Sequence, residues 1–185
     1  GRQDSLTSLF EYQFDIGWRF NSNARYMNVH SDIQRGVVYG YQLVNDRPWL
    51  KAYDELTPAR VSTFSMDNHI SGDVDAGPTR HTLLAGIDFS TGSLKNELYS
   101  VGPVLIDPYS SDYRPDLNPD FTASRAAPWK EKQTFNRTGV YVQDQMAWNR
   151  WRLTLSGRHD WSNTDHETNS YSPVTVKSRQ EDTQW

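Results

Sequence analysis

The sequence predicts an all-β chain, a segment of an antiparallel up-and-down transmembrane β-barrel, and three observations support this fold class. Apolar and polar residues alternate over long stretches, tight turns join these stretches in pairs, and long polar stretches separate the pairs. A strand that crosses a bilayer needs about 9–11 residues, whereas most strands of globular domains have about five or six. We therefore expect about six strands and the start of another, arranged as three hairpins of an incomplete barrel.

The clearest hairpin covers residues 138–161, with a tight turn at residues 147–150. In its second strand, most of the alternate residues from Trp151 to Trp161 are apolar, and the residues between them are charged or carry hydroxyl groups. Successive side chains of a strand point to opposite faces, so this strand has one apolar face and one polar face. Aromatic residues at both ends of the apolar face are typical of rings at the two membrane interfaces.

The first strand of this hairpin, residues 136–148, has a polar group on each face. Val140 and Val142 share one face with Asp144, and the other face carries Tyr141 and Gln143. We assign the valine face to lipid, with Asp144 close to the interface, where the cost of a charge is small.

The other two hairpins follow the same alternation. The first joins residues 6–14 to 18–26, the second joins residues 62–74 to 81–90, and residues 181–185 have the pattern of a strand at its start. Short periplasmic turns and long extracellular loops are typical of outer-membrane barrels. We expect the polar stretches rich in Asn, Asp, Ser, Pro and Tyr to be the long loops, namely residues 31–60, 91–135 and 162–180.

Composition excludes several classes of protein. No segment approaches the roughly 18 consecutive apolar residues of a transmembrane helix. The net charge of −4 provides no basic surface for nucleic acid. No catalytic or phosphate-binding motif occurs, and the five histidines lack the spacing of metal ligands. We therefore expect no enzyme activity, no metal site, no cofactor and no nucleic-acid partner.

Five segments occur in the order in which one known family has them: FEYQFD at residues 10–15, VVYGYQL at 37–43, RHTLLAGIDF at 80–89, LIDPYSSDY at 105–113, and TGVYVQDQMAW with LTLSGRHDW at 138–148 and 153–161. The chain thus resembles the TonB-dependent siderophore receptors of the Gram-negative outer membrane. Within that family, it is most similar to the ferrichrome-type branch, which binds ferric hydroxamates.

The resemblance implies a barrel of about 22 strands whose lumen is closed by a plug. The six or seven strands of this chain would be less than a third of that barrel. The family's plug, its short motif for the energy-coupling protein and its terminal aromatic residue have no counterpart in residues 1–185. We expect an internal piece of the barrel domain, surrounded by outer-membrane lipid. Alone, its two open edges would leave backbone groups unpaired in the bilayer.

The resemblance also implies the ligand and its site. An iron-loaded hydroxamate siderophore binds at the extracellular mouth and is imported with energy from the TonB complex, through parts of the parent chain that this sequence lacks. The family's binding aromatics carry over to Tyr39 and Tyr41 of the VYGY segment and to Tyr99 in the second long stretch. A tyrosine ring offers apolar contact, and its hydroxyl group can donate to a ligand oxygen.

Three alternatives remain open at this point. The tyrosines could serve only to hold loops in place. The chain could belong to a passive, porin-like outer-membrane barrel, for which ion conductance without a ligand is expected. It could also be a soluble all-β ligand-binding module, for which short loops and solubility without detergent are expected.

Overall fold

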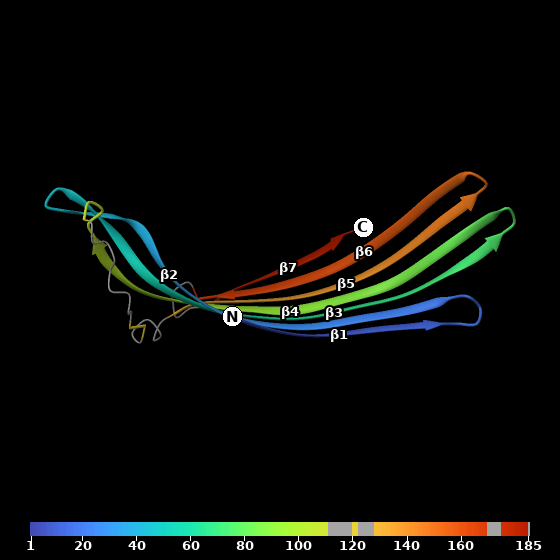
Figure 1. The fold of residues 1–185 in the computed structure, drawn as a ribbon, viewed down its shortest axis with the longest axis horizontal. Helices are drawn as coiled ribbons and strands as arrows, with labels where there is room; N and C mark the ends of the chain where they lie inside the picture. Colours follow the sequence, from blue (N-terminus) through green and yellow to red (C-terminus); the bar gives the residue numbers. More distant parts are fainter. Residues whose placement is uncertain (111–119, 122–127, 170–174, 185) are drawn as a thin grey trace.

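The computed structural model describes residues 1–110, 120–121, 128–169 and 175–184. These residues form one antiparallel sheet of seven strands, in which each strand pairs with its neighbours in the sequence. This confirms the predicted fold class, an unclosed up-and-down sheet. Figure 1 shows the sheet as a long, curved ribbon whose strands all run along its length. The strands are β1 (Arg2–Gln13), β2 (Arg19–Val44), β3 (Arg47–Ala76), β4 (Thr79–Ile106), β5 (Trp129–Trp148), β6 (Trp151–Thr168) and β7 (Val176–Gln184).

Three tight turns lie at the same end of the sheet, on the right in Figure 1, and we call this the short-turn end. They join β1 to β2, β3 to β4 and β5 to β6, as the sequence predicted. Gly17, Gly77 and Asn149 have φ angles of 82°, 62° and 51° in these turns. Glycine and asparagine reach this left-handed region at lower cost than other residues, so these residues permit the turns.

At the opposite end, β2, β3 and β4 extend well beyond the other strands (Figure 1). β2 and β3 continue to a turn at Asn45 and Asp46, whose φ angles are 51° and 61°. The prediction of a loop at residues 31–60 was therefore wrong. In this stretch, apolar residues such as Val37 and Val38 are adjacent instead of alternating with polar ones, so it lacks the alternation that marks a membrane-crossing strand.

The other two predicted loops are also shorter than expected. Much of the stretch 91–135 belongs to β4 and β5, and β6 and β7 extend into the stretch 162–180 from its two sides. The seventh strand therefore begins at Val176, before the predicted start. Parts of these stretches, and Trp185, lie outside the described residues.

The pairing register divides the sheet into an apolar face and a polar face. Residues directly opposite each other share a face, so Leu155, Asp144 and Leu83 lie in one row on the apolar face. The same face carries Val142 and Ile87, which are 60% and 47% exposed. In the described part of the chain, Phe121 alone among the large apolar side chains is buried. The apolar face is therefore uncovered, as expected for a surface that faces lipid.

The valines of β5 lie on the apolar face, in agreement with the assignment made from the sequence. Asp144 shares that face, and its Oδ2 lies 2.9 Å from Nδ1 of His81 on β4. Both side chains are partly shielded from solvent. The carboxylate on the apolar face thus has a cationic or hydrogen-bonding partner on the adjacent strand, which lowers the cost of placing it there.

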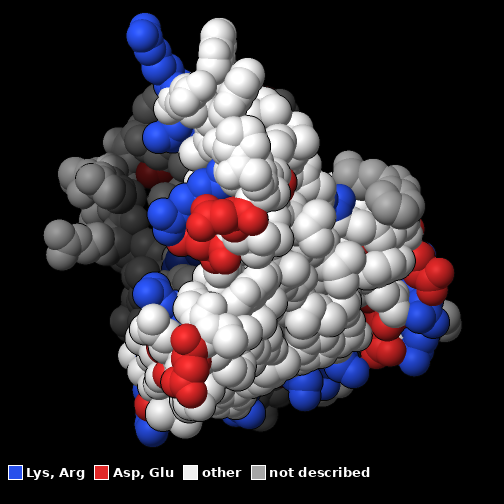
Figure 2. All heavy atoms as spheres, turned by 90° about the vertical axis from the view of Figure 1, so that its right-hand side faces the viewer, with Lys and Arg blue, Asp and Glu red and all other residues white. Residues whose placement is uncertain are grey.

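Charged side chains gather in patches around a broad uncharged surface at the short-turn end (Figure 2). Acidic and basic groups lie next to each other in these patches. Near this end, Arg80 Nη2 is 2.6 Å from Asp73 Oδ2, and Arg19 Nε is 3.5 Å from Glu11 Oε1. Among the described residues, no helix is long and apolar enough to cross a membrane.

Candidate functional site

The polar face carries rows of charged and hydrogen-bonding side chains from β2 to β6. Two adjacent rows contain the ion pairs of Arg158 with Asp88 and Asp160 and of His69 with Asp67. Each row crosses the strands at right angles, and each contains one glycine. From β6 to β2, the rows are Asp160, Gly139, Asp88, Asp67 and Asn23, and Arg158, Tyr141, Gly86, His69 and Asn21.

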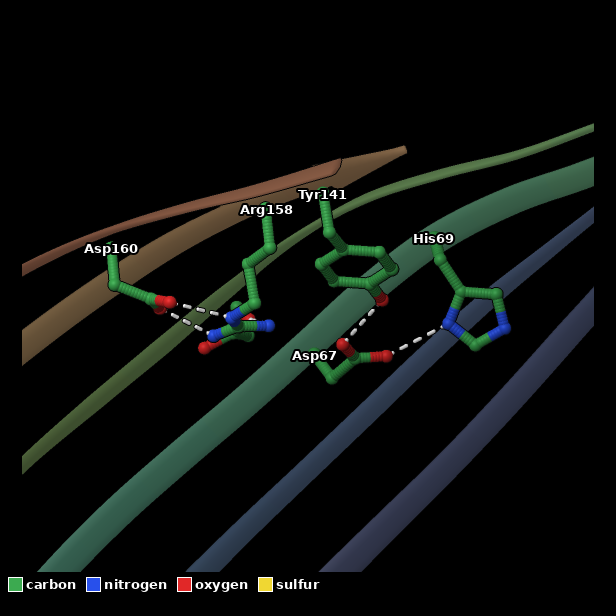
Figure 3. Close-up of polar contacts among 6 residues, drawn as sticks. Asp67, His69, Tyr141, Arg158 and Asp160 are labelled. Atoms are coloured by element: carbon green, nitrogen blue, oxygen red, sulfur yellow. Dashed lines mark hydrogen bonds and ion pairs between the residues drawn. The ribbon is translucent and has the colours of Figure 1, made fainter. Parts of the chain in front are cut away.

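Tyr141 connects β5 to β3 by reaching over the intervening strand. Its hydroxyl group donates a hydrogen bond to Oδ2 of Asp67 at 2.6 Å, and Nδ1 of His69 lies 2.8 Å from the other oxygen of that carboxylate. Figure 3 shows the ring of Tyr141 directed toward Asp67, with His69 beside the same carboxylate. Gly86 provides the space, because a Cβ atom there would lie 2.3 Å from Cζ of the Tyr141 ring.

Arg158 forms a second connection in the same way. Its Nε and Nη2 donate to the two oxygens of Asp160 at 2.7 and 2.6 Å, and its Nη1 lies 2.8 Å from Oδ2 of Asp88. A Cβ atom on Gly139 would lie 2.3 Å from Nη2 of the guanidinium group. The paired charges of Arg158, Asp88 and Asp160 therefore join β6 to β4.

The outer end of the long β2–β3 hairpin holds Tyr39, the first of the predicted ligand-binding residues. Its hydroxyl group donates to Oε1 of Glu55 at 2.9 Å, and its ring centroid lies 5.7 Å from that of Tyr53. A β-bulge interrupts β2 between Val38 and Tyr41, and Gly40 within it has a φ angle of 87°. The ring of Tyr39 thus packs near Tyr53 while its hydroxyl group binds a carboxylate.

Tyr41 does not share this environment. It pairs with Leu50 of β3, a position on the opposite face of that strand from Glu55, and is 65% exposed. In a strand without a bulge, residues 39 and 41 would share a face. The extra residue in the bulge therefore places the two tyrosines of the VYGY segment on different faces.

Tyr99 lies on β4, within a strand rather than in a loop. It pairs with Leu56 of β3, and its hydroxyl group donates to the carboxylate of Glu97. Leu56 is adjacent to Glu55, so Tyr99 lies on the face opposite to the Tyr39 contact. The structure does not bring Tyr39, Tyr41 and Tyr99 together, and their role in ligand binding stays a prediction.

Glu55 and Arg35 are prominent at this end of the hairpin, and the sequence did not indicate either of them. Glu55 is 2% exposed, and Nη2 and Nε of Arg35 lie 2.9 and 3.0 Å from its Oε2. Both residues fell in a stretch that we expected to be a loop. An Asn-Asp pair between two stretches of strand-forming residues was the available signal, because both residues tolerate the φ angles of a tight turn.

An ion pair connects β6 and β7 beyond the end of the apolar face. Nζ of Lys177 lies 2.9 Å from Oε1 of Glu167. The hydrogen bond from Lys177 lowers the pKa of the Glu167 carboxyl group, and the same contact raises the pKa of the Lys177 ammonium group. In the described ranges, no group of three or more His, Cys, Asp and Glu side chains is arranged to hold a metal ion.

Two curated proteins show what the chain is similar to. It is 32% identical over 159 residues to the "Ferrioxamine B receptor" of Salmonella typhimurium (strain SL1344), covering 86% of this chain and 22% of that protein. It is 26% identical over 181 residues to the "Ferrichrome outer membrane transporter/phage receptor" of Escherichia coli K12, covering 84% of this chain and 23% of that protein. The chain spans less than a quarter of the length of these relatives.

The fold is similar to that of solved receptors. The chain superimposes on the closed form of the ferric-catecholate import receptor Fiu from E. coli K12 with a TM-score of 0.72, covering 98% of this chain and 29% of that one, at 15% identity. This likeness concerns the fold. The sequence profile described as "TonB dependent receptor-like, beta-barrel" matches residues 1–185, the whole chain. The chain therefore belongs to the TonB-dependent receptor-like β-barrel family, and its location is the outer membrane of a Gram-negative bacterium.

Proposed function

We propose that the chain forms part of the barrel wall of a receptor that binds a ferric siderophore of the hydroxamate type and imports it with energy from the TonB complex. The main support is the family match over residues 1–185, together with relatives named for ferrioxamine B and ferrichrome. Both of those ligands are ferric hydroxamates. The plug and the remaining strands would lie in other parts of the parent protein.

In this proposal the end of the sheet opposite the short turns faces the outside of the cell. The long β2–β3 hairpin then projects from the outer surface, where it can contact a ligand. The exposed rings of Tyr39 and Tyr41 lie on this projection. A ferric tris-hydroxamate is bulky and roughly neutral, so aromatic rings suit it better than a cluster of charges.

The test uses the full-length parent receptor, expressed in a host that lacks other hydroxamate receptors. Iron uptake is measured with ferrioxamine B, with ferrichrome and with a ferric catecholate of similar size. We expect uptake of at least one hydroxamate complex, no uptake of the catecholate, and loss of uptake when the host lacks TonB. Uptake of the catecholate alone would contradict the hydroxamate assignment.

A passive barrel is the second candidate function. It gives ion conductance across planar bilayers without any ligand, and uptake that does not depend on TonB. Such a result would overturn the proposal of active import. The uncovered apolar face argues against the third alternative, a soluble module, since that module would expose this face to water.

A further inference from the structure

The side chain of Glu55 is almost completely buried near the outer end of the long hairpin, where the neighbouring side chains of β3 are half-buried and most of those of β2 are exposed. A buried carboxylate is costly unless hydrogen bonds and an opposite charge compensate for the lost water. Both oxygens of Glu55 are satisfied. Arg35 donates to Oε2 from Nε and lies within ion-pair distance through Nη2, while Tyr39 donates to Oε1 at 2.9 Å.

The β-bulge sets the direction of Tyr39. Glu55 lies directly opposite Arg35 in the register, and Tyr53 lies opposite Val37. Tyr39 follows both of these positions along β2, so its side chain must lean back toward them to make its contacts. Bulges commonly redirect a side chain in this way. The left-handed φ angle of Gly40, 87°, is the local backbone conformation that accompanies this change of direction.

A phenol group has a single hydrogen to donate. In Tyr39 that hydrogen points to Glu55, so a ligand that approaches this residue meets the ring and the phenol oxygen instead of an O–H donor. The ring of Tyr53, 5.7 Å away and inclined by 56°, extends the same aromatic surface. Bulky ligands of low charge gain from such apolar contact.

We propose that Glu55 is a positioning residue for siderophore binding, which holds Tyr39 so that its ring, and not its hydroxyl donor, contacts the ligand. This inference rests on the proposed function. It assigns a role to a buried acidic residue that makes no direct contact with the ligand. It also reverses the expectation, drawn from the sequence, that the hydroxyl group of Tyr39 donates to a ligand oxygen.

The experiment measures the Kd of the full-length receptor for ferrioxamine B and ferrichrome. We expect Tyr39→Ala to raise the Kd by about tenfold, and Tyr39→Phe and Glu55→Ala to raise it by a smaller and similar factor, because each of these two removes the hydrogen bond that holds the ring in place. The double variant Tyr39→Ala with Glu55→Ala should bind no more weakly than Tyr39→Ala, because residues that act through one contact are not additive. Glu55→Gln should retain most of the affinity, since its amide oxygen still accepts the Tyr39 hydrogen.

Glu131→Ala is the matched control. Glu131 also forms a short ion pair at the same end of the sheet, with Oε1 2.8 Å from Nε2 of His166, so its partner is a histidine rather than a tyrosine. This variant should bind as wild type does. Heat-dependent mobility on gels verifies that each variant is a folded barrel in the outer membrane before binding is measured.

Several outcomes would overturn the inference. A further loss of affinity when Tyr39→Phe is added to Glu55→Ala would mean that the hydroxyl group itself binds the ligand. Normal affinity in folded Glu55→Ala, or in folded Tyr39→Ala, would remove the positioning role while wild-type uptake still supported the proposed function. A wild-type receptor that neither binds nor imports either complex would instead contradict the proposed function itself, and with it this inference.

Discussion

The hydroxyl group of Tyr141 on β5 binds the carboxylate of Asp67 on β3, two strands away in the sheet. The contact is possible because Gly86, on the strand between them, has no side chain. The adjacent Arg158 lies across Gly139 in the same manner and joins β6 to β4. Side chains on the polar face therefore tie together strands that share no backbone hydrogen bonds.

This arrangement predicts that Gly86→Val destabilises the barrel. The new side chain would overlap the ring of Tyr141 and displace it from Asp67, at a cost of about 1–3 kcal/mol. Gly157→Val is the matched control, since a Cβ atom there would lie 4.0 Å from Val142, an ordinary contact. Urea unfolding of the full-length receptor in liposomes measures both variants, and equal stability of the two would contradict the prediction.

Arg158→Lys should also destabilise the barrel, because an ammonium group cannot bind both oxygens of Asp160 and also reach Asp88. All three side chains are partly exposed, so we expect a loss of only about 0.5–1 kcal/mol. Arg152→Lys serves for comparison, since Arg152 donates to backbone carbonyl groups at a turn. The same urea measurement applies. An effect of Arg152→Lys as large as that of Arg158→Lys would mean that the contacts of the Arg158 guanidinium group with Asp160 and Asp88 make no special contribution to stability.

The His81–Asp144 pair on the apolar face predicts that replacing the histidine lowers the stability of the barrel, whereas replacing the aspartate does not. His81→Leu leaves the carboxylate of Asp144 facing lipid without its histidine partner, which should cost about 1–3 kcal/mol. Asp144→Leu removes the charge and should leave stability unchanged or increase it. The double variant should be close to Asp144→Leu. Unfolding in lipid vesicles gives the three values, and a stable His81→Leu variant would show that the pair does not lower the cost of the charge.

The Glu167–Lys177 contact predicts a pH dependence in the pairing of β6 with β7. The lowered pKa of Glu167 means that its contribution is complete above the ordinary value of 4.5 and is lost as the pH falls through the lowered pKa. The raised pKa of Lys177 means that its contribution is complete below 10.5 and is lost as the pH rises through the raised pKa. The contact is therefore at full strength between these two values.

Amide hydrogen exchange in β7 can test this dependence. The Lys177→Gln variant should exchange faster than wild type at pH 7, and the ratio of the two rates should approach one as the pH falls well below 4.5. Because the variant and wild type are compared at each pH, the intrinsic pH dependence of exchange cancels. A ratio that stays constant over this range would mean that the ion pair has no part in the pairing.

The sequence predicted the short-turn end of the sheet well and the opposite end poorly. Near the short turns, the apolar face imposes a strict alternation, and residues such as Gly77 and Asn149 mark where the chain reverses. In the outer parts of β2 and β3, apolar residues such as Val37 and Val38 are adjacent instead of alternating with polar ones, so no periodic signal distinguishes strand from loop. There, backbone hydrogen bonds between neighbouring strands extend β2 and β3. Such pairing depends on two separate segments of the chain, so neither segment alone predicts it.

The candidate site shows the same limit. Tyr39 and Tyr41 could be named from the family resemblance, but their separation onto two faces depends on the bulge at Gly40, which is visible only in the pairing register. Arg35 and Glu55 are 20 positions apart in the sequence, and their contact depends on the hairpin turn between them. A polar residue in a presumed loop gives no indication of such a partner.

The order of strands in the sheet, which follows the order of the chain from β1 to β7, has a consequence for how the barrel wall forms. Each strand can pair with the strand that has just preceded it, so no step of assembly has to close a loop that contains another strand, which keeps the entropic cost of closure low. The barrel wall can therefore form one hairpin at a time along the chain, because no strand has to pair with a strand that is distant in the sequence. Side chains such as Tyr141, which contact a strand two positions away in the sheet, can form these contacts only after the adjacent hairpin is complete. They therefore stabilise the sheet late, once its strands have paired.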